Sequence, residues 1–105
     1  MASANDMKNP IDKLNKAFES RVRLGIMSTL LVNEYVDFNS LKDLLNVTDG
    51  NLASHLKSLE QSEYIEMKKE FINRKPNTKY YVSTKGRQAF SEHISALEEL
   101  IKNNN

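Results

Sequence analysis

Cysteine is absent from this 105-residue chain, and glycine and proline are scarce, with three and two copies. The lack of cysteine excludes disulfides, thiolate metal sites and cysteine nucleophiles. No segment approaches the ~18 consecutive apolar residues of a membrane-spanning helix. The first ten residues, MASANDMKNP, also lack the apolar stretch of a secretory signal. We therefore expect a cytoplasmic protein.

The sequence also lacks the common catalytic and cofactor motifs. It has no glycine-rich phosphate loop, no His–acid constellation and no nucleophile elbow. Its two histidines, His55 and His93, fall on different predicted helices. Glu98 and Glu99 are neighbours on a helix surface and cannot converge on one substrate. We expect a protein that is not an enzyme and that binds no metal ion and no cofactor.

Length and composition fit one small folded domain. Hydrophobic residues make up 39% and charged residues 28% of the chain, which is typical of a globular protein. A chain of this length can build a single modest core. We expect residues 1–8 to be a disordered leader and residues 9–103 to form the domain.

The net charge of +1 conceals an uneven distribution. Residues 66–87 hold seven basic and two acidic side chains, which gives +5, whereas residues 1–65 and residues 88–105 each carry −2. Local basic clustering on a nearly neutral protein is the electrostatic footprint of a small DNA-binding domain. The alternative is a solvated hairpin whose lysines deter association at a strand edge.

Apolar spacing in the first third of the chain predicts two helices. The first begins at Pro10, which suits a first helical turn, and repeats its apolar residues at i, i+3 and i+7. The second is capped by Ser20, runs to about Asn33 and is apolar around much of its circumference, so it should be central and buried. A short extended segment follows at residues 36–38. The apolar residues of the first helix are Ile11, Leu14 and Phe18.

The next segment predicts a helix-turn-helix. Ser40 caps a short helix that Asn46 ends in the left-handed conformation, and Thr48 caps a second helix over about residues 49–61. Two helices joined in this way can place the second one in the DNA major groove. Leucines at i, i+4 and i+7 must face the core: Leu52, Leu56 and Leu59.

The outer face of this second helix is polar, short-chained and poor in acid. Short side chains let a helix approach base edges, and asparagine can pair with adenine. Gly50 costs helix propensity, ~1 kcal/mol against alanine, which close approach of a DNA backbone would explain. The alternative is an ordinary solvated face, although such faces usually carry more Glu and Lys. The candidate DNA-contacting residues are Thr48, Asn51, Ser54, His55, Lys57 and Ser58.

A hairpin and a long final helix complete the predicted fold. Residues 64–68 alternate as a strand, residues 73–78 form a loop and residues 79–83 return as the second strand. Thr84 caps a last helix that runs to about Lys102. The fold class is mainly α with a small β-hairpin (α+β), namely a winged helix-turn-helix with extra N- and C-terminal helices.

The predicted wing, about residues 72–79, carries long cations that can reach phosphates or a narrow minor groove. Pro76 stiffens it, and it has neither the Gly-Asn nor the Asp-Gly pair that a solvated turn favours. The candidate DNA-contacting residues here are Asn73, Arg74, Lys75 and Lys79.

The apolar stripe of the last helix is wider than one small core requires, and exposed apolar strips usually mark a partner surface. We therefore predict a two-fold homodimer that presents two recognition helices ~34 Å apart to a pseudopalindromic operator. The alternative is a single long core helix. The predicted dimer interface comprises Ile11, Leu14, Phe18, Phe90, Ile94, Leu97 and Ile101.

The segment TDGNLASHLKSLE, from Thr48 to Glu60, and the wing RKPNTKYY, from Arg74 to Tyr81, resemble the winged-helix transcriptional regulators related to the MarR and ArsR groups. The resemblance spans about residues 14–100. It implies a homodimer joined by its terminal helices. Two features differ from the family. The chain lacks the cysteine ligands of ArsR metal sensors, and it is too short to add the helical scaffold that surrounds the effector pocket of larger MarR proteins. The resemblance matches Asn51, Ser54, His55 and Ser58 to recognition-helix positions, and Arg74 and Lys75 to the wing.

Together these patterns predict a sequence-specific, double-stranded-DNA-binding transcriptional regulator, acting as a repressor rather than an activator. The alternative is a winged-helix module for protein–protein contact without DNA binding, because fold alone does not fix function. RNA binding is a third option, weakened by the lack of an aromatic stacking platform. The sequence does not identify an effector.

Overall fold

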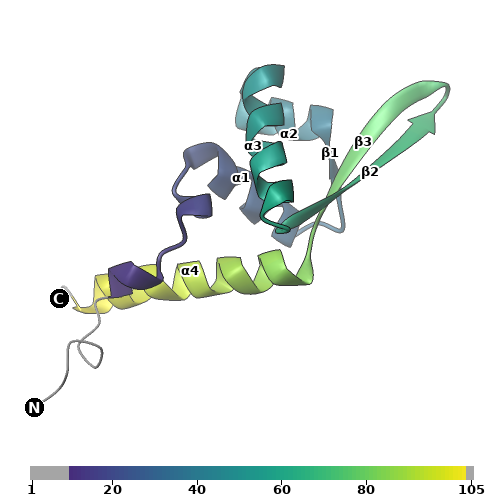
Figure 1. The fold of residues 1–105 in the computed structure, drawn as a ribbon. Coiled ribbons are helices and arrows are strands. Elements are labelled where there is room, and N and C mark those ends of the chain that lie inside the picture. Colours follow the sequence, from purple (N-terminus) through teal and green to yellow (C-terminus); the bar gives the residue numbers. More distant parts are fainter. Residues whose placement is uncertain (1–9, 104–105) are drawn as a thin grey trace, which may run out of the picture.

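The computed structural model describes residues 10–103, so the predicted leader lies outside the described residues. Three α-helices and a long hairpin stand above a fourth, rod-like helix, with overall extents of 66 × 24 × 22 Å (Figure 1). Within residues 10–103, none of the helices combines the length and the apolar character that a membrane span requires. The elements are η1 (Pro10–Lys13), η2 (Lys16–Phe18), α1 (Arg21–Leu31), β1 (Val36–Asp37), α2 (Phe38–Leu45), α3 (Asp49–Gln61), β2 (Ile65–Ile72), β3 (Lys75–Val82) and α4 (Thr84–Asn103).

The core confirms that α1 is the central helix of the fold. The side chain of Ser20 caps α1 by accepting the backbone N–H of Arg23 at 3.3 Å. Gly25 lets α2 approach α1 closely, because a Cβ atom there would lie 2.5 Å from Cδ2 of Leu45. The largest fully buried side chains come from η2 and the three helices of the body: Phe18, Ile26, Met27, Leu30, Leu41, Leu52, Leu56 and Leu59.

Two of the predicted helix caps are wrong by one to three residues. Asp37, not Ser40, caps α2 by accepting the backbone N–H of Ser40 at 2.8 Å. Pairing of β1 with β3 keeps the chain extended through Asp37, so the helix begins directly after it. Ser83, not Thr84, accepts the backbone N–H of Gly86 at 2.9 Å at the start of α4. The left-handed Asn46 (φ 52°) at the end of α2 is confirmed.

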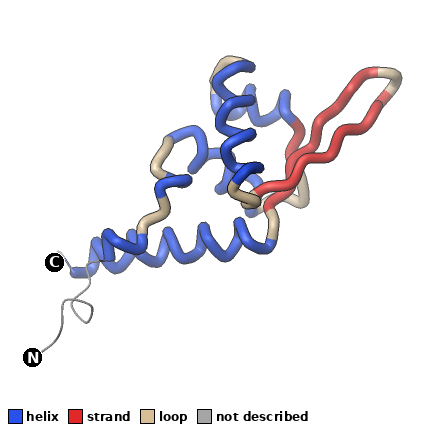
Figure 2. The backbone as a smooth tube through the Cα atoms, viewed as in Figure 1, coloured by secondary structure: helices blue, strands red, loops and turns tan. Residues whose placement is uncertain are grey.

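The sheet has the order β1-β3-β2, with both pairs antiparallel, and its two long strands form the wing (Figure 2). Pairing continues from Ile65↔Val82 to Ile72↔Lys75, so the predicted loop over residues 73–78 is wrong. Only two residues turn the chain, and both have positive φ, as a type I′ hairpin turn requires. Asparagine tolerates this conformation well, but arginine adopts it rarely, so the sequence did not reveal the tight turn. The turn residues are Asn73 (φ 52°) and Arg74 (φ 66°).

The predicted continuous N-terminal helix is also wrong, because two short 3-10 helices separate at Asn15. The backbone N–H of Asn15 donates to Nδ1 of His93 at 3.0 Å, and its side-chain amide donates to the Tyr64 hydroxyl at 2.9 Å. In place of helical bonds, these tertiary bonds hold the segment against α4 and against the turn before β2. Phe18 then lies in the core, with ring centroids 5.2 Å from those of Tyr64 and Phe90.

Candidate nucleic-acid interface

Helix α3 presents the face that its leucine spacing predicts. Leu52, Leu56 and Leu59 are 0%, 1% and 0% exposed, so the opposite side of the helix faces solvent. Along that side no aromatic or large aliphatic residue covers the backbone, which leaves a face that a base edge can approach. The predicted contact residues that are exposed on this face are Thr48, Asn51, Ser54 and Lys57, and Ser58 lies half-buried beside them.

The N-terminus of α3 has its one acidic side chain neutralised. Thr48 caps the helix by accepting the backbone N–H of Asn51 at 3.1 Å, as predicted. The carboxylate of Asp49 lies 2.7 Å from the ammonium of Lys42. The hydrogen bond from Lys42 to Asp49 raises the pKa of that lysine, so the lysine keeps its charge. Repulsion between Asp49 and an approaching phosphate is thereby reduced, at the helix end that favours anions.

Gly50 is not required by packing within the protein. A Cβ atom at this position would meet no atom within 4 Å, and the residue is exposed in the first turn of α3. Its backbone is helical and has no positive φ that would demand glycine. The loss of helix propensity therefore has no structural reason within the described chain, which favours close approach of a ligand.

His55 is held by a residue that sequence reasoning missed. The guanidinium of Arg23 lies 3.0 Å from Nδ1 of His55 and also donates to the backbone carbonyls of Lys16 and Ala17. Burial, followed by the charge of Arg23, lowers the pKa of His55. The neutral ring accepts at Nδ1, which leaves the proton on Nε2 free to donate outward. Arg23 lies with Arg21 in the first turn of α1, and nothing in the sequence distinguished it as the partner of His55.

The tip of the wing carries unpaired positive charge. Asn73, Arg74 and Lys75 are all exposed. Among the described residues 10–103, no ion pair joins Arg74 or Lys75 to a carboxylate. The tip extends well beyond the helical body, where these cations can reach a neighbouring surface (Figure 2).

Lys79 does not lie at the tip, contrary to its predicted position. Its register partner is Lys68, and its side chain is only 16% exposed. The ammonium is 3.2 Å from a carboxylate oxygen of Glu70 and 4.2 Å from the ring centroid of Tyr35. The hydrogen bond with Glu70 raises the pKa of Lys79. Lys79 therefore joins the middle of the wing to the segment before β1.

The predicted dimer residues divide into two groups. Phe18 and Phe90 are 0% and 7% exposed and pack on each other within one protomer, so their prediction as interface residues is wrong. Their side chains belong to the core, where Phe90 of α4 meets Phe18 of η2. Ile11 and Ile101 are 55% and 66% exposed on η1 and on the end of α4. The remaining members are partly buried: Leu14, Ile94 and Leu97.

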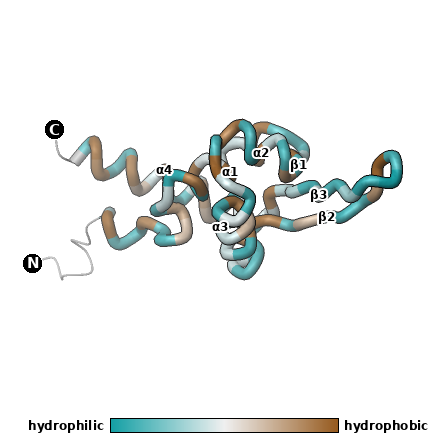
Figure 3. The backbone as a smooth tube through the Cα atoms, turned by 90° about the horizontal axis from the view of Figure 1, so that it is seen from above, coloured by the Kyte–Doolittle hydropathy of each residue, from teal (hydrophilic) through white to brown (hydrophobic). Residues whose placement is uncertain are grey.

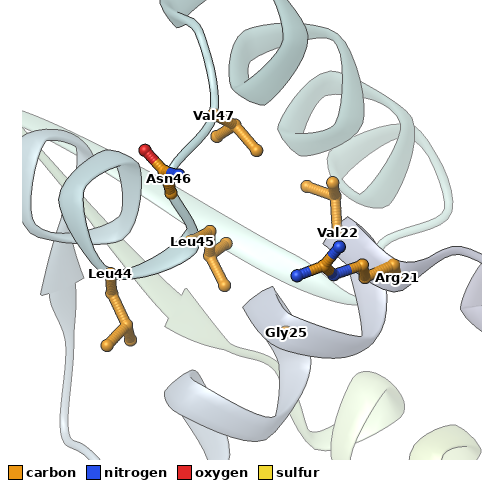
Figure 4. Close-up of a pocket in the computed structure, with 7 residues that line it drawn as sticks. All are labelled: Arg21, Val22, Gly25, Leu44, Leu45, Asn46 and Val47. Carbon is orange, nitrogen blue, oxygen red and sulfur yellow. The ribbon is translucent and has the colours of Figure 1, made fainter.

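A hollow of about 400 Å³ lies between α1 and the turn that precedes α3 (Figure 4). Arg21 is the only charged residue in its lining, and Asn46 adds one polar side chain. Within residues 10–103, no group of three or more His, Asp or Glu side chains could hold a metal ion. The lining residues are Arg21, Val22, Gly25, Leu44, Leu45, Asn46 and Val47.

Comparison with known proteins agrees with this geometry. Residues 22–101 match the winged helix DNA-binding domain family. An uncharacterized protein of Methanocaldococcus jannaschii is 44% identical over 88 residues, which cover 84% of this chain and 96% of that protein. The structure of a transcriptional regulator homologue from Pyrococcus horikoshii is 27% identical with a TM-score of 0.82, covering 94% of this chain and 96% of that one.

More distant structures share the fold alone. A MarR family regulator from Silicibacter pomeroyi is 13% identical with a TM-score of 0.61, covering 95% of this chain and 69% of that one. An ArsR family regulator is 16% identical, also with a TM-score of 0.61, and each chain is covered to 97%. These matches confirm the winged-helix fold class and the resemblance to MarR and ArsR regulators. The chain belongs to the winged helix DNA-binding domain family, and this supports a role in DNA-binding transcription regulation.

Proposed function

We propose that the chain is a sequence-specific reader of double-stranded DNA that lays α3 in the major groove. The observation that carries this proposal is the outer face of α3, where Asn51, Ser54 and Lys57 are exposed along the helix that begins beside Gly50. Asparagine and serine can bond to base edges, and lysine can bond to guanine or to a phosphate. The ion pair of Asp49 with Lys42 limits repulsion by acid at the leading end of the helix.

The wing holds the neighbouring DNA backbone or minor groove through Arg74 and Lys75. Contacts of this kind fix the register of a protein on the duplex and carry little direct sequence information. Their loss should weaken binding to every duplex, whereas changes on α3 should alter sequence preference. The neutral ring of His55, at the side of α3, adds an N–H donor at Nε2, and the contact of Arg23 with Nδ1 fixes the orientation of that ring.

A homodimer is the assembly that best accounts for the terminal segments. Ile101 remains 66% exposed at the end of α4, and Ile11 is 55% exposed on η1, which packs along the same helix. Burying such side chains against a symmetry mate is favourable. Two copies of α3 spaced by ~34 Å would then contact successive major-groove turns of a pseudopalindromic operator. Occupation of such a site blocks access to a promoter, which makes the protein a repressor.

Selection of duplexes from a random pool at two salt concentrations tests the proposal directly. Enrichment of one pseudopalindromic sequence, with affinity that falls steeply as salt increases, is the expected result. A pool that stays unenriched at low salt would instead favour the protein-interaction module. In vitro transcription from a promoter that carries the selected site distinguishes repression from activation.

Sedimentation velocity tests the dimer independently of DNA. An Ile101→Glu variant should sediment as a monomer, because the new charge would be buried at the interface without a partner. Val32→Glu is the matched control, since Val32 is 81% exposed at the end of α1, away from the terminal segments. A wild-type chain that sediments as a monomer at micromolar concentration would contradict the dimer.

A further inference from the structure

The outer end of the wing is apolar as well as cationic. Phe71 is 77% exposed and Ile72 is 46% exposed, directly before the turn at Asn73 and Arg74. Hydropathy mapped on the chain shows this apolar segment at the far end of the hairpin, away from the helical body (Figure 3). Neither side chain belongs to the core or packs against it. Folding of the domain therefore does not explain these two residues.

The pairing register places the two apolar side chains on opposite faces of the hairpin. Phe71 pairs with Pro76, and Ile72 pairs with Lys75. Successive residues of a strand point to opposite faces, so Phe71 and Pro76 cover one side of the tip and Ile72 covers the other. Arg74 lies between them in the turn. The tip is thus an apolar wedge that carries cations at its edge.

The wedge stands on a stiff support. Eight consecutive residue pairs join β2 to β3, and the turn is closed by only two residues. Midway along the hairpin, Lys79 bonds to Glu70 and lies over Tyr35, whose ring is 5.8 Å from that of Tyr81. A pre-organised hairpin of this kind loses little conformational freedom on binding.

This combination of groups matches the chemistry of the DNA minor groove. Deoxyribose forms apolar walls, phosphates line both rims, and proteins that insert apolar side chains there partially unstack base steps. The groove of B-form DNA is about 6 Å wide. A strand pair with side chains on both faces is about 10 Å thick, which is the spacing of stacked sheets. The tip can enter only if the groove widens.

We propose that the wing tip inserts Phe71 and Ile72 into the minor groove beside the site read by α3, and widens it there. The inference rests on the proposed DNA-binding function and extends it from backbone contact to DNA deformation. Pyrimidine–purine steps unstack most easily, so they are selected at positions that α3 does not contact. Arg74 and Lys75 neutralise the phosphates on the two rims.

The test compares Phe71→Ala and Ile72→Ala with Met67→Ala in the full chain on a selected duplex. Met67 is a suitable control because it is 41% exposed on the same face of β2 as Phe71 but four residues, about 13 Å, nearer the base. Affinity is measured at several salt concentrations. 2-Aminopurine placed at successive steps reports unstacking, and energy transfer between dyes at the two duplex ends reports bending.

Phe71→Ala should weaken binding about ten- to hundredfold, as expected for loss of a buried aromatic side chain. The salt dependence should stay unchanged because no cation is removed. Phe71→Ala and Ile72→Ala should reduce both the increase in 2-aminopurine fluorescence and the bending of the duplex. Met67→Ala should leave both signals as they are in the wild type. Thermal unfolding should be alike for all variants, since the three side chains are exposed.

Two results would overturn the inference and leave the proposed function standing: unchanged affinity and bend for Phe71→Ala, or a loss of self-association in place of a loss of DNA affinity. A wild-type chain that binds no duplex at low salt would overturn both proposals.

Discussion

The guanidinium of Arg23 lies 3.0 Å from Nδ1 of His55 and so joins helix α1 to helix α3. The same guanidinium donates to the carbonyls of Lys16 and Ala17, which belong to η2. Because arginine can only donate, the bond requires Nδ1 of His55 to be unprotonated. One side chain thus connects the terminal segment, the central helix and the proposed recognition helix.

Both histidines should make the fold less stable in mild acid. Burial lowers the pKa of His55 and of His93 below the usual value near 6.5. A base whose pKa is lower in the folded than in the unfolded state stabilises the fold fully above the unfolded value, and less as the pH falls below it. Urea unfolding should therefore give a lower free energy of unfolding at pH 5.5 than at pH 7.5.

Replacing each histidine in turn shows how much each one contributes to this pH dependence of stability. His93 is 3% exposed, and its Nδ1 accepts the backbone N–H of Asn15. Protonation of Nδ1 would place two N–H groups facing each other and would break this hydrogen bond. A His93→Gln variant should show a smaller difference between the two pH values than the wild type, and so should His55→Gln. Proton NMR titration in which either ring has a pKa above 6.5 would contradict the assignment.

Removing the cations of the wing tip should weaken binding without changing sequence preference. The Arg74→Ala, Lys75→Ala double variant should lose affinity for all duplexes, because contacts to phosphates do not distinguish bases. Fluorescence anisotropy over a range of salt should give a slope of log affinity against log salt that is smaller by about 2. Lys102→Ala, an exposed lysine at the opposite end of the molecule, serves as the control. An unchanged slope would remove the wing from the interface.

Asn51 should contribute to sequence discrimination rather than to general affinity. Its backbone N–H is taken by Thr48, but its side chain is exposed and has no partner within the described chain. Asn51→Ala should cost about 1–3 kcal/mol on the selected duplex and little on random DNA. Competition assays with both duplexes measure the difference. Equal losses on the two would show that Asn51 does not contact a base.

Gly50 should show a trade-off between stability and binding. Gly50→Ala should raise the free energy of unfolding by about 0.5–1 kcal/mol, because alanine favours the helix and its Cβ meets no protein atom. The same methyl group would lie between α3 and DNA, so affinity for the selected duplex should fall. Chemical denaturation and anisotropy on one preparation measure both quantities. A variant that is more stable and binds equally well would show that DNA does not approach Gly50 closely.

Local signals predicted much of the helical fold. The leucine spacing of α3 predicted its buried face, and Thr48 and Asn46 marked helix boundaries where the structure has them. These features depend on residues three or four apart, which a reader of the sequence can compare directly. The positions of Asn51, Ser54 and Lys57 on the outer face follow from the same spacing.

Other features depended on contacts between residues distant in the chain. Asn15 interrupts the expected N-terminal helix because its hydrogen bonds to His93 and Tyr64 replace helical ones. The same packing places Phe18 in the core, where it cannot serve a partner. The apolar spacing correctly predicts that Phe18 is buried. The prediction was wrong about what buries it, which is the core of the same protomer and not a second protomer.

The amino-acid sequence by itself determined the helix-turn-helix, the polar face of α3 and the basic character of the hairpin, because each follows from the chemistry of residues close together in the chain. Only the tertiary structure decided which cations remain unpaired. Lys79 is bound to Glu70 across the strand pair, whereas Arg74 and Lys75 extend beyond any carboxylate in residues 10–103. The register of β2 against β3 determines which charged side chains become partners. That register depends on the two-residue turn at Asn73 and Arg74, and the turn takes up its conformation only when the two strands pair.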